Sequence, residues 1–271
     1  MDVSIIIPLY NQLRYTQICL DSLRTYGTGG GKIFLIDNGS TDGTGAYLAE
    51  CPDVVVRSNR ENLGCAGAWN QGVRDTNSEW LVFLNNDVIV SPGWLEGLMA
   101  FAKDTGADVV SPAIREGECN YEICTYSRDF ETKMVNAVRM GVADGICFMV
   151  RRRVFETIGL FDENFRIGQF EDADFFRRAQ NAGFRLGTTG RSFIHHFGSV
   201  TQASIRKNKT AKPYEAENRA YYRSKWNLTW WKRFRERQMR KCRGVVWRTT
   251  EKLRYGHTLK EKWFCGRLRY Y

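Results

Sequence analysis

The sequence has 271 residues and a mass of 31.3 kDa, enough for one large domain or for one domain with an extension. Apolar residues make up 43% and charged residues 26%, so collagen-like, disordered and disulfide-scaffold proteins are excluded. No apolar run reaches the ~18 residues of a membrane span, and the start MDVSIIIPLY lacks the basic region and cleavage site of a signal peptide. We therefore expect a cytoplasmic protein whose eight cysteines are reduced.

The net charge of +10 is divided unevenly along the chain. Residues 201–271 hold 21 Lys and Arg against 5 Asp and Glu, whereas residues 1–200 hold 19 against 25. The chain therefore combines an acidic body with a strongly basic C-terminal part. Such a part attracts phosphate groups, whether of anionic lipid, of a lipid-linked acceptor or of nucleic acid.

Apolar runs alternate with amphipathic stretches over the first 110 residues. Strands are predicted where β-branched and other apolar residues are continuous, at 3–10, 32–37, 54–58, 80–87 and 108–112. Helices are predicted between them, at 13–26, 42–50, 65–75 and 93–103. This alternation predicts βαβ units on a mainly parallel sheet, which is an α/β fold.

The pattern is less regular in the second half of the chain. Residues 113–140 are polar and are predicted to form a hairpin or a flexible loop. The remaining predicted elements are a strand at 144–152, a short helix in VFETIGLF, a helix at 171–182 and two short strands within 184–197. From about residue 205 the composition changes to Lys, Arg, Trp and Tyr at helical spacing. We predict one domain at 1–205 and a basic, aromatic-rich helical extension at 206–271.

The residues that follow the predicted strands are the first candidates for a binding site, because ligands of open parallel sheets bind beyond the carboxyl ends of the strands. Tyr10 and Asn11 follow the first strand, and DNGSTDGT follows the second. Asp37 in that segment can accept a hydrogen bond from a nucleobase, although an Asx turn with a helix cap explains the segment equally well. A Gly-rich turn with Gly64 and Gly67 follows the third strand, and the helix that begins there favours a bound phosphate.

Two segments carry residue types that suit a metal ion. Asn85-Asn86-Asp87 follows the fourth strand, and its carboxylate suits a divalent cation that bridges two phosphates. A turn that ends the strand is the simpler explanation. His195 and His196 are neighbours on a predicted strand, where their side chains point to opposite faces. One of them can therefore bind a metal while the other packs.

Three carboxylates open the predicted helix at 171–182, namely Glu171, Asp172 and Asp174. Acidic residues at a helix N-terminus interact favourably with the helix dipole, and this alone explains their presence. Alternatively, one carboxylate faces the pocket and takes a proton from an acceptor hydroxyl.

Taken in order, these segments resemble the family 2 glycosyltransferases of the GT-A fold. The resemblance covers about residues 3–226 and is carried by VSIIIPLYN, DNGSTDGT, NLGCAGAWNQG, LNNDV, DGICFMVRRRVFETIGLFDENF, EDADFFRRAQNAGFRL and HHFGS. Each segment alone is weak, but their order is specific. The resemblance implies a nucleoside-diphosphate sugar donor, with UDP or dTDP favoured, and Mn²⁺ or Mg²⁺ as the cofactor.

The resemblance also implies residue roles. Asp172, in the Glu171-Asp172 pair, matches the base of a single displacement with inversion. Asp87 is the one carboxylate left in the metal-binding motif, and His195 is the best match to the family's metal-binding histidine, with His196 second. The positions that match the donor site are Pro8, Tyr10, Asn11, Asp37, Asn38, Asn62, Gly64, Gly67, Asn70, Asn85, Asn86, Asp144 and Gly145.

The sequence leaves the acceptor and the role of the basic extension open. The resemblance favours a glycan or a lipid-linked glycan in cell-surface glycan assembly. The extension at 206–271 suits the anionic inner face of a membrane, a nucleic acid, or simple packing of its Trp and Phe side chains on the body. Two other functions remain, namely a transferase that acts on a hydroxyl of a DNA base and a catalytically inactive sugar-nucleotide-binding protein.

Overall fold

The computed structural model describes residues 2–198 and 214–271. Its first half alternates strands and helices as the sequence predicts, except that a short strand, β5, which was not predicted, follows β4 directly. The elements are β1 (Val3–Leu9), α1 (Leu13–Tyr26), β2 (Lys32–Asp37), α2 (Thr44–Ala49), β3 (Val55–Ser58), α3 (Gly64–Arg74), β4 (Trp80–Leu84), β5 (Val88–Val90), α4 (Trp94–Thr105) and β6 (Val109–Glu116). The α/β class is confirmed.

The second half contains shorter strands and the longest helix. Its elements are α5 (Ile123–Met134), β7 (Val138–Met140), β8 (Cys147–Arg151), α6 (Arg152–Ile158), α7 (Glu171–Asn181), β9 (Leu186–His196), α9 (Tyr214–Lys225), α10 (Trp230–Tyr255), β10 (Lys260–Phe264) and β11 (Arg267–Tyr270). The predicted boundary between residues 205 and 206 lies outside the described residues.

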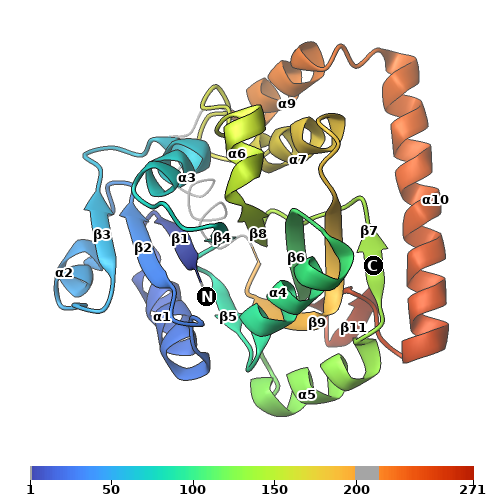
Figure 1. Cartoon of the computed structure of the whole chain (residues 1–271), viewed down its shortest axis with the longest axis horizontal. Coiled ribbons are helices and arrows are strands. Elements are labelled where there is room, and N and C mark those ends of the chain that lie inside the picture. The colour runs from blue at the N-terminus through green and yellow to red at the C-terminus, as the bar shows by residue number, and fades with distance from the viewer. Residues whose placement is uncertain (1, 199–213) are drawn as a thin grey trace.

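A single sheet runs through the molecule in the order β11-β10-β6-β8-β4-β1-β2-β3 (Figure 1). Strand β1 pairs in parallel with β2 and β4, and β2 pairs in parallel with β3. The carboxyl ends of these strands therefore meet at one edge. Strand β8 runs antiparallel between β4 and β6, and β9 pairs with β5, β6 and β7. The predicted mainly parallel sheet thus carries antiparallel additions in its second half.

Alternation along β1 distributes its side chains to two cores. Ile5 and Ile7 pack with α1 and α4 on one face, whereas Ile6 packs with α3, α6 and α7 on the other. Gly72 permits the close approach of α3, because a Cβ there would lie 2.4 Å from Cγ2 of Ile6. Trp69 of α3 anchors an aromatic cluster in the second core. The two cores fix the ends of the parallel strands relative to α3 and α7.

The segment predicted as an irregular loop, residues 113–140, is largely ordered. It contains the end of β6, helix α5 and strand β7. Helix α5 begins at Glu122, whose side chain accepts hydrogen bonds from the backbone N–H groups of Cys124 and Thr125. Phe130 and Met134 of α5 are buried in a third core. Helix formation here depends on packing against residues distant in the sequence. The polar local sequence therefore did not predict the helix. Residues 184–197, predicted as two short strands, form the single strand β9.

The basic extension is helical only in part. Helix α10 runs along one side of the molecule, and β10 and β11 then join the edge of the central sheet, where β10 pairs in parallel with β6 (Figure 1). Arg139 of β7 and Glu251 of α10 form a buried ion pair with a 2.7 Å N–O distance, which anchors the end of the helix. The last part of the chain is therefore integral to the sheet.

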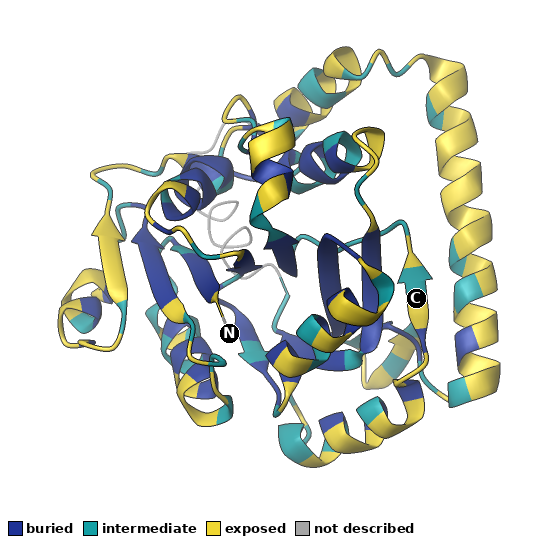
Figure 2. Ribbon diagram, in the orientation of Figure 1, coloured by how far each residue is buried: buried dark blue, intermediate teal, exposed yellow. Residues whose placement is uncertain are grey.

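Most of α10 is exposed, and Glu251 is its one buried residue (Figure 2). All eight cysteines are free thiols. Within residues 2–198 and 214–271, no helix is both long enough and apolar enough to cross a membrane.

Candidate functional site

A pocket of about 320 Å³ lies at the carboxyl ends of β1 and β4, next to the first turns of α3 and α7. This is the edge of the sheet at which ligands of α/β proteins bind. Most of the predicted site residues line it. They are Pro8, Tyr10, Asn38, Asn62, Asn85, Asn86, Asp87, Asp144, Gly145, Glu171, Asp172 and His196.

Asn11 and Asp37 do not line this pocket but hold the turn beside it. The Asp37 carboxylate accepts a hydrogen bond from the backbone N–H of Ser40 at 3.0 Å, as expected of an Asx turn. The Asn11 side-chain oxygen accepts from the backbone N–H of Thr41 at 2.7 Å. For Asp37, the turn explanation therefore accounts for the side chain without a nucleobase.

Three predicted residues of α3 also lie outside the pocket lining, namely Gly64, Gly67 and Asn70. Gly64 and Asn70 instead pack α3 against neighbouring segments. Gly64 has a φ of +79°, and a Cβ there would lie 3.0 Å from the backbone nitrogen of Ile167. The side chain of Asn70 is buried, and it donates to the carbonyl of Phe161 and accepts from the N–H of the same residue, both at 2.9 Å. We therefore no longer assign Asn70 to donor binding.

The structure brings His196, not His195, to Asp87. The Nε2 atom of His196 lies 3.3 Å from Oδ1 of Asp87, and both residues line the pocket. His195 points the other way and contacts the Tyr121 hydroxyl through Nδ1 at 2.8 Å. Burial, followed by the charges of His196 and Arg115, lowers the pKa of His195 to about 4. The first choice between the two histidines is thus reversed.

Asp87 and His196 fit a divalent cation as two of its ligands. His196 is 3% exposed, and within the described residues neither of its ring nitrogens has a hydrogen-bond partner. A buried imidazole without such a partner beside a carboxylate suits metal coordination. In the same described residues, no three His, Cys, Asp or Glu side chains form a complete metal site. Further ligands would have to come from a diphosphate and from water, which Mg²⁺ sites commonly use.

Asp172 occupies the first turn of α7, and its carboxylate faces Gly145. Oδ1 of Asp172 accepts a hydrogen bond from the N–H of Ala173 at 2.7 Å. Burial, followed by the charge of Asp144, raises the pKa of Asp172. Burial, followed by the charge of Asp172, raises the pKa of Glu171 to about 8. At neutral pH, burial therefore favours a proton on Glu171.

Lys260 of β10 reaches the pocket, which the sequence did not predict. Its Nζ atom lies 2.6 Å from Oδ2 of Asp144. Burial acts to raise the pKa of Asp144, but the charge of Lys260 and its hydrogen bond outweigh burial and lower this pKa. On the same strand, Lys262 pairs with Glu116, another pocket residue, at 2.8 Å. The C-terminal hairpin therefore sets part of the charge balance of the pocket.

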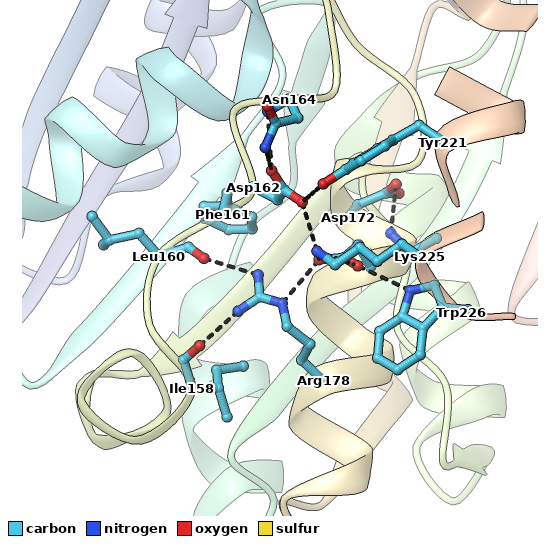
Figure 3. Close-up of polar contacts among 12 residues, drawn as sticks. Ile158, Leu160, Phe161, Asp162, Asn164, Asp172, Arg178, Tyr221, Lys225 and Trp226 are labelled. Carbon is cyan, nitrogen blue, oxygen red and sulfur yellow. Dashed lines mark hydrogen bonds and ion pairs between the residues drawn. The ribbon is translucent and has the colours of Figure 1, made fainter. Parts of the chain in front are cut away.

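Helix α9 fixes the position of α7. Lys225 pairs with Asp162 at 2.6 Å and with Asp174 at 2.9 Å, and Trp226 donates its indole N–H to Asp174 at 2.9 Å (Figure 3). Asp174 is fully buried and also accepts from Arg178. Asp174 thus has a structural role, and the contacts around it hold the turn that carries Asp172.

Comparison with protein families agrees with this arrangement. The family model described as glycosyl transferase family 2 matches residues 4–159, which contain every pocket strand up to β8. The chain belongs to this family. The matched region ends before α7, so the assignment of Asp172 rests on the geometry described above.

Among curated proteins, this family 2 chain is similar to glycosyltransferase AglE of Haloferax volcanii, with 28% identity over 68% of the chain. It is also 28% identical, over 72% of its length, to the pre-mycofactocin glycosyltransferase of Mycobacterium tuberculosis. It spans 63% and 42% of the lengths of these two relatives.

Solved structures with a similar fold include GalNAc-T7 with UDP, GalNAc and Mn²⁺, at a TM-score of 0.59 and 17% identity, with 72% of this chain and 43% of that chain covered. Residues 1–349 of TarS from S. aureus with UDP-GlcNAc match at a TM-score of 0.56 and 17% identity, with 72% and 58% covered. These likenesses confirm the predicted GT-A fold of the family 2 chain.

Proposed function

We propose that the protein transfers a sugar from a nucleoside-diphosphate donor to an acceptor hydroxyl, with inversion at the anomeric carbon. The observation that carries this proposal is the single pocket at which Asp87, His196 and Asp172 meet in a chain of family 2. Asp87 and His196 on one side of this pocket suit a diphosphate with its metal ion. Asp172 on the other side can act as a catalytic base. Cell-surface glycan assembly is the role we favour.

For the donor we propose a uridine or thymidine diphosphate sugar. Tyr10 lines the pocket with an aromatic ring, which suits a pyrimidine. Asn38 and Asn62 line the same pocket and offer amide groups for a ribose or phosphate. UDP in the GalNAc-T7 structure and UDP-GlcNAc in the TarS structure support this choice.

Asp87 and His196 would hold Mn²⁺ or Mg²⁺ against the diphosphate. When bound, such an ion neutralises charge on the leaving group. Asn85 and Asn86 precede Asp87 in the pocket wall, although the Asn86 amide also bonds Thr16 in the interior. The Mn²⁺ of the GalNAc-T7 structure supports this assignment.

Asp172 is the group we assign as the base. Its carboxylate accepts the proton of the acceptor hydroxyl while the hydroxyl oxygen attacks the anomeric carbon. The bond from this carbon to the diphosphate breaks, and the nucleoside diphosphate leaves. Glu171 retains its own proton at neutral pH and so does not compete for this role. The Ala173 N–H holds one carboxylate oxygen and leaves Oδ2 for the acceptor.

The first experiment measures thermal stability with UDP, dTDP, GDP and CMP, each with and without Mn²⁺. A ligand at a hundredfold excess over its Kd stabilises the native state by ~2.7 kcal/mol. We expect a pyrimidine diphosphate to stabilise the protein in a Mn²⁺-dependent manner. His196→Gln should remove the Mn²⁺ dependence, and His195→Gln, at the neighbouring position, serves as the matched control. Failure of all four nucleotides to stabilise the protein would overturn the proposal.

We also propose peripheral binding to an anionic membrane through α10. Trp230 and Trp231 are 57% and 71% exposed, and Phe234 is 46% exposed, in a helix rich in Lys and Arg. Exposed aromatic rings beside basic side chains are typical of helices that lie at the headgroup level. Flotation with liposomes of phosphatidylglycerol should retain the protein, and Trp230→Ala with Trp231→Ala should release it. Retention on DNA but not on these liposomes would instead favour a nucleic-acid partner.

A further inference from the structure

A second cavity, of about 860 Å³, lies between α7, α9 and α10. Helix α10 forms one wall, and the other walls come from α7, α9 and the segment before β8. Figure 1 shows α9 above α7, and α10 continuing from α9 down the outer side of the molecule. We call this cavity the arginine groove after its lining arginines, which are Arg177, Arg219, Arg223, Arg233, Arg237, Arg240 and Arg243.

The arginine groove adjoins the pocket at the proposed base. Phe170 and Ala173 line the groove, whereas Glu171 and Asp172, which lie between them in the chain, line the pocket. In the same way, residues 141–143 line the groove and the next residue, Asp144, lines the pocket. The two cavities therefore share two segments as a common wall. A molecule that occupies the groove would therefore lie against the turn that carries Asp172.

The groove carries far more positive than negative charge. Glu236 is the single acidic residue in its lining, against seven arginines. Over the described residues, Glu236 pairs with Arg177 at 3.2 Å, and the other six arginines have no carboxylate partner. The Nε atom of Arg233 is buried and has no hydrogen-bond partner in that part of the chain. Like charges at this density repel one another, so an anion in the groove would be strongly favoured.

The face of α10 that lines the groove is basic rather than apolar. Its groove-lining residues Arg233, Arg237 and Arg240 recur every three or four positions and so share the face toward the body. Met239 is the one apolar residue of α10 in this lining, whereas the exposed rings of Trp230 and Phe234 do not line the groove. A helix that turns its basic face inward is not explained by core packing, for which the apolar face would be buried.

We propose that the arginine groove binds the phosphate groups of a phosphate-bearing glycan, which is the acceptor, and directs its hydroxyl to Asp172. This inference rests on the proposed transferase function. The planar guanidinium matches phosphate in a bidentate manner. Arg233 and Arg240 are seven residues apart on α10, which separates their backbones by ~10 Å and suits more than one phosphate. Single-stranded nucleic acid needs open aromatic surfaces for its bases, whereas the rings in the groove lining are buried in Phe176 and half-buried in Phe170 and Tyr222.

The test compares two double variants of α10 that remove the same charge. Arg237→Gln with Arg240→Gln alters the groove, and Arg235→Gln with Arg248→Gln alters exposed positions outside it. The binding probes are N-acetylglucosaminyl diphosphate on a short alkyl chain, a glycerol phosphate oligomer, a neutral maltooligosaccharide and a single-stranded DNA. Binding is measured over a salt series, and UDP binding is measured for every variant.

We expect at least one phosphate-bearing glycan probe to bind tenfold tighter than the neutral oligosaccharide. The groove variant should lose at least tenfold in this affinity, and its log–log salt slope should fall by ~1 for each lost phosphate contact. Tighter binding of the N-acetylglucosaminyl diphosphate probe would indicate a lipid-linked acceptor. Tighter binding of the glycerol phosphate oligomer would indicate a polymeric acceptor. Equal losses in both variants, equal binding of the neutral probe, or tighter binding of DNA would overturn the inference. If the wild type binds UDP or dTDP, any of these results would overturn this inference alone. Failure of the wild type to bind UDP, dTDP, GDP or CMP would instead overturn the transferase proposal.

Discussion

Gly145 provides the space that the Asp172 carboxylate occupies. The Gly145→Ala variant therefore tests the assignment of Asp172 as the base while Asp172 itself is kept. A Cβ at residue 145 would lie 2.0 Å from Oδ2 of Asp172, whereas contacts shorter than 3.0 Å are essentially never seen. The carboxylate oxygen must therefore move by about 1 Å. A displacement of this size can cost a reaction ~100-fold, which corresponds to ~2.7 kcal/mol in the barrier.

The assay follows release of the nucleoside diphosphate during transfer, together with UDP affinity and thermal stability. We expect kcat of Gly145→Ala to fall about 100-fold in a folded protein. Gly244→Ala in α10 is the matched control, since no atom lies within 4 Å of the added Cβ and its activity should be unchanged. Gly145→Ala should also add little to Asp172→Asn, because that variant has already lost the base. A folded Gly145→Ala protein with kcat within threefold of wild type would refute the assignment.

Three further predictions concern the charges of the pocket. Asp172→Asn should keep UDP affinity but lose at least ~100-fold in kcat, and near-normal turnover would assign the base elsewhere. The pKa of Glu171 is about 8 in the native protein and near 4.5 when unfolded, so the native chain keeps a proton that the unfolded chain releases between these values. The free energy of unfolding of the wild type should therefore fall, relative to Glu171→Gln, as pH rises from 4.5 to 8, and a constant difference in denaturant titrations would contradict this. Lys260→Gln and Lys262→Gln each remove a partly exposed ion pair and should each cost ~1 kcal/mol or less in such titrations, but only the former should shift the pH profile of kcat.

The order of strands and helices up to β6, apart from the short strand β5, followed directly from the sequence, because each of these elements has a strong local signal. Continuous apolar runs such as VSIIIPLY produce buried strands, and the helices between them show helical spacing of apolar residues. The positions of most pocket residues followed as well, since parallel strands deliver their carboxyl ends to one edge of the sheet.

The C-terminal hairpin was not predicted, because its charged and aromatic residues match the helical composition before it. One local signal was present. Cys265 and Gly266 both adopt positive φ angles, of 49° and 72°, as in the two-residue turns that join antiparallel strands. The pairing of β10 with β6 brings Lys260 to Asp144, a contact across 116 residues that no local pattern reveals.

The choice between the two histidines depended on strand register, which the sequence does not encode locally. Adjacent residues on β9 face opposite sides, so a shift of one residue would exchange their roles. In the structure, Val88 of β5 pairs with His196, and this register directs the His196 side chain to Asp87. The structural role of Asn70 could not be predicted for a similar reason, since its hydrogen-bond partner Phe161 lies 91 residues away in the sequence.

The ion pair between Lys260 and Asp144 has a consequence for synthesis of the chain. At 5–20 residues per second, the ribosome adds the 116 residues between these partners in about 6 to 23 s. During this interval the segments that carry Asp87 and Asp144 have been made, but the lysine that neutralises Asp144 has not. The nascent chain can therefore assemble the nucleotide side of its pocket several seconds before the charge balance is complete. A nascent chain that stalls within α10 would lack Lys260 and Lys262, and would therefore carry Asp144 and Glu116 as uncompensated carboxylates.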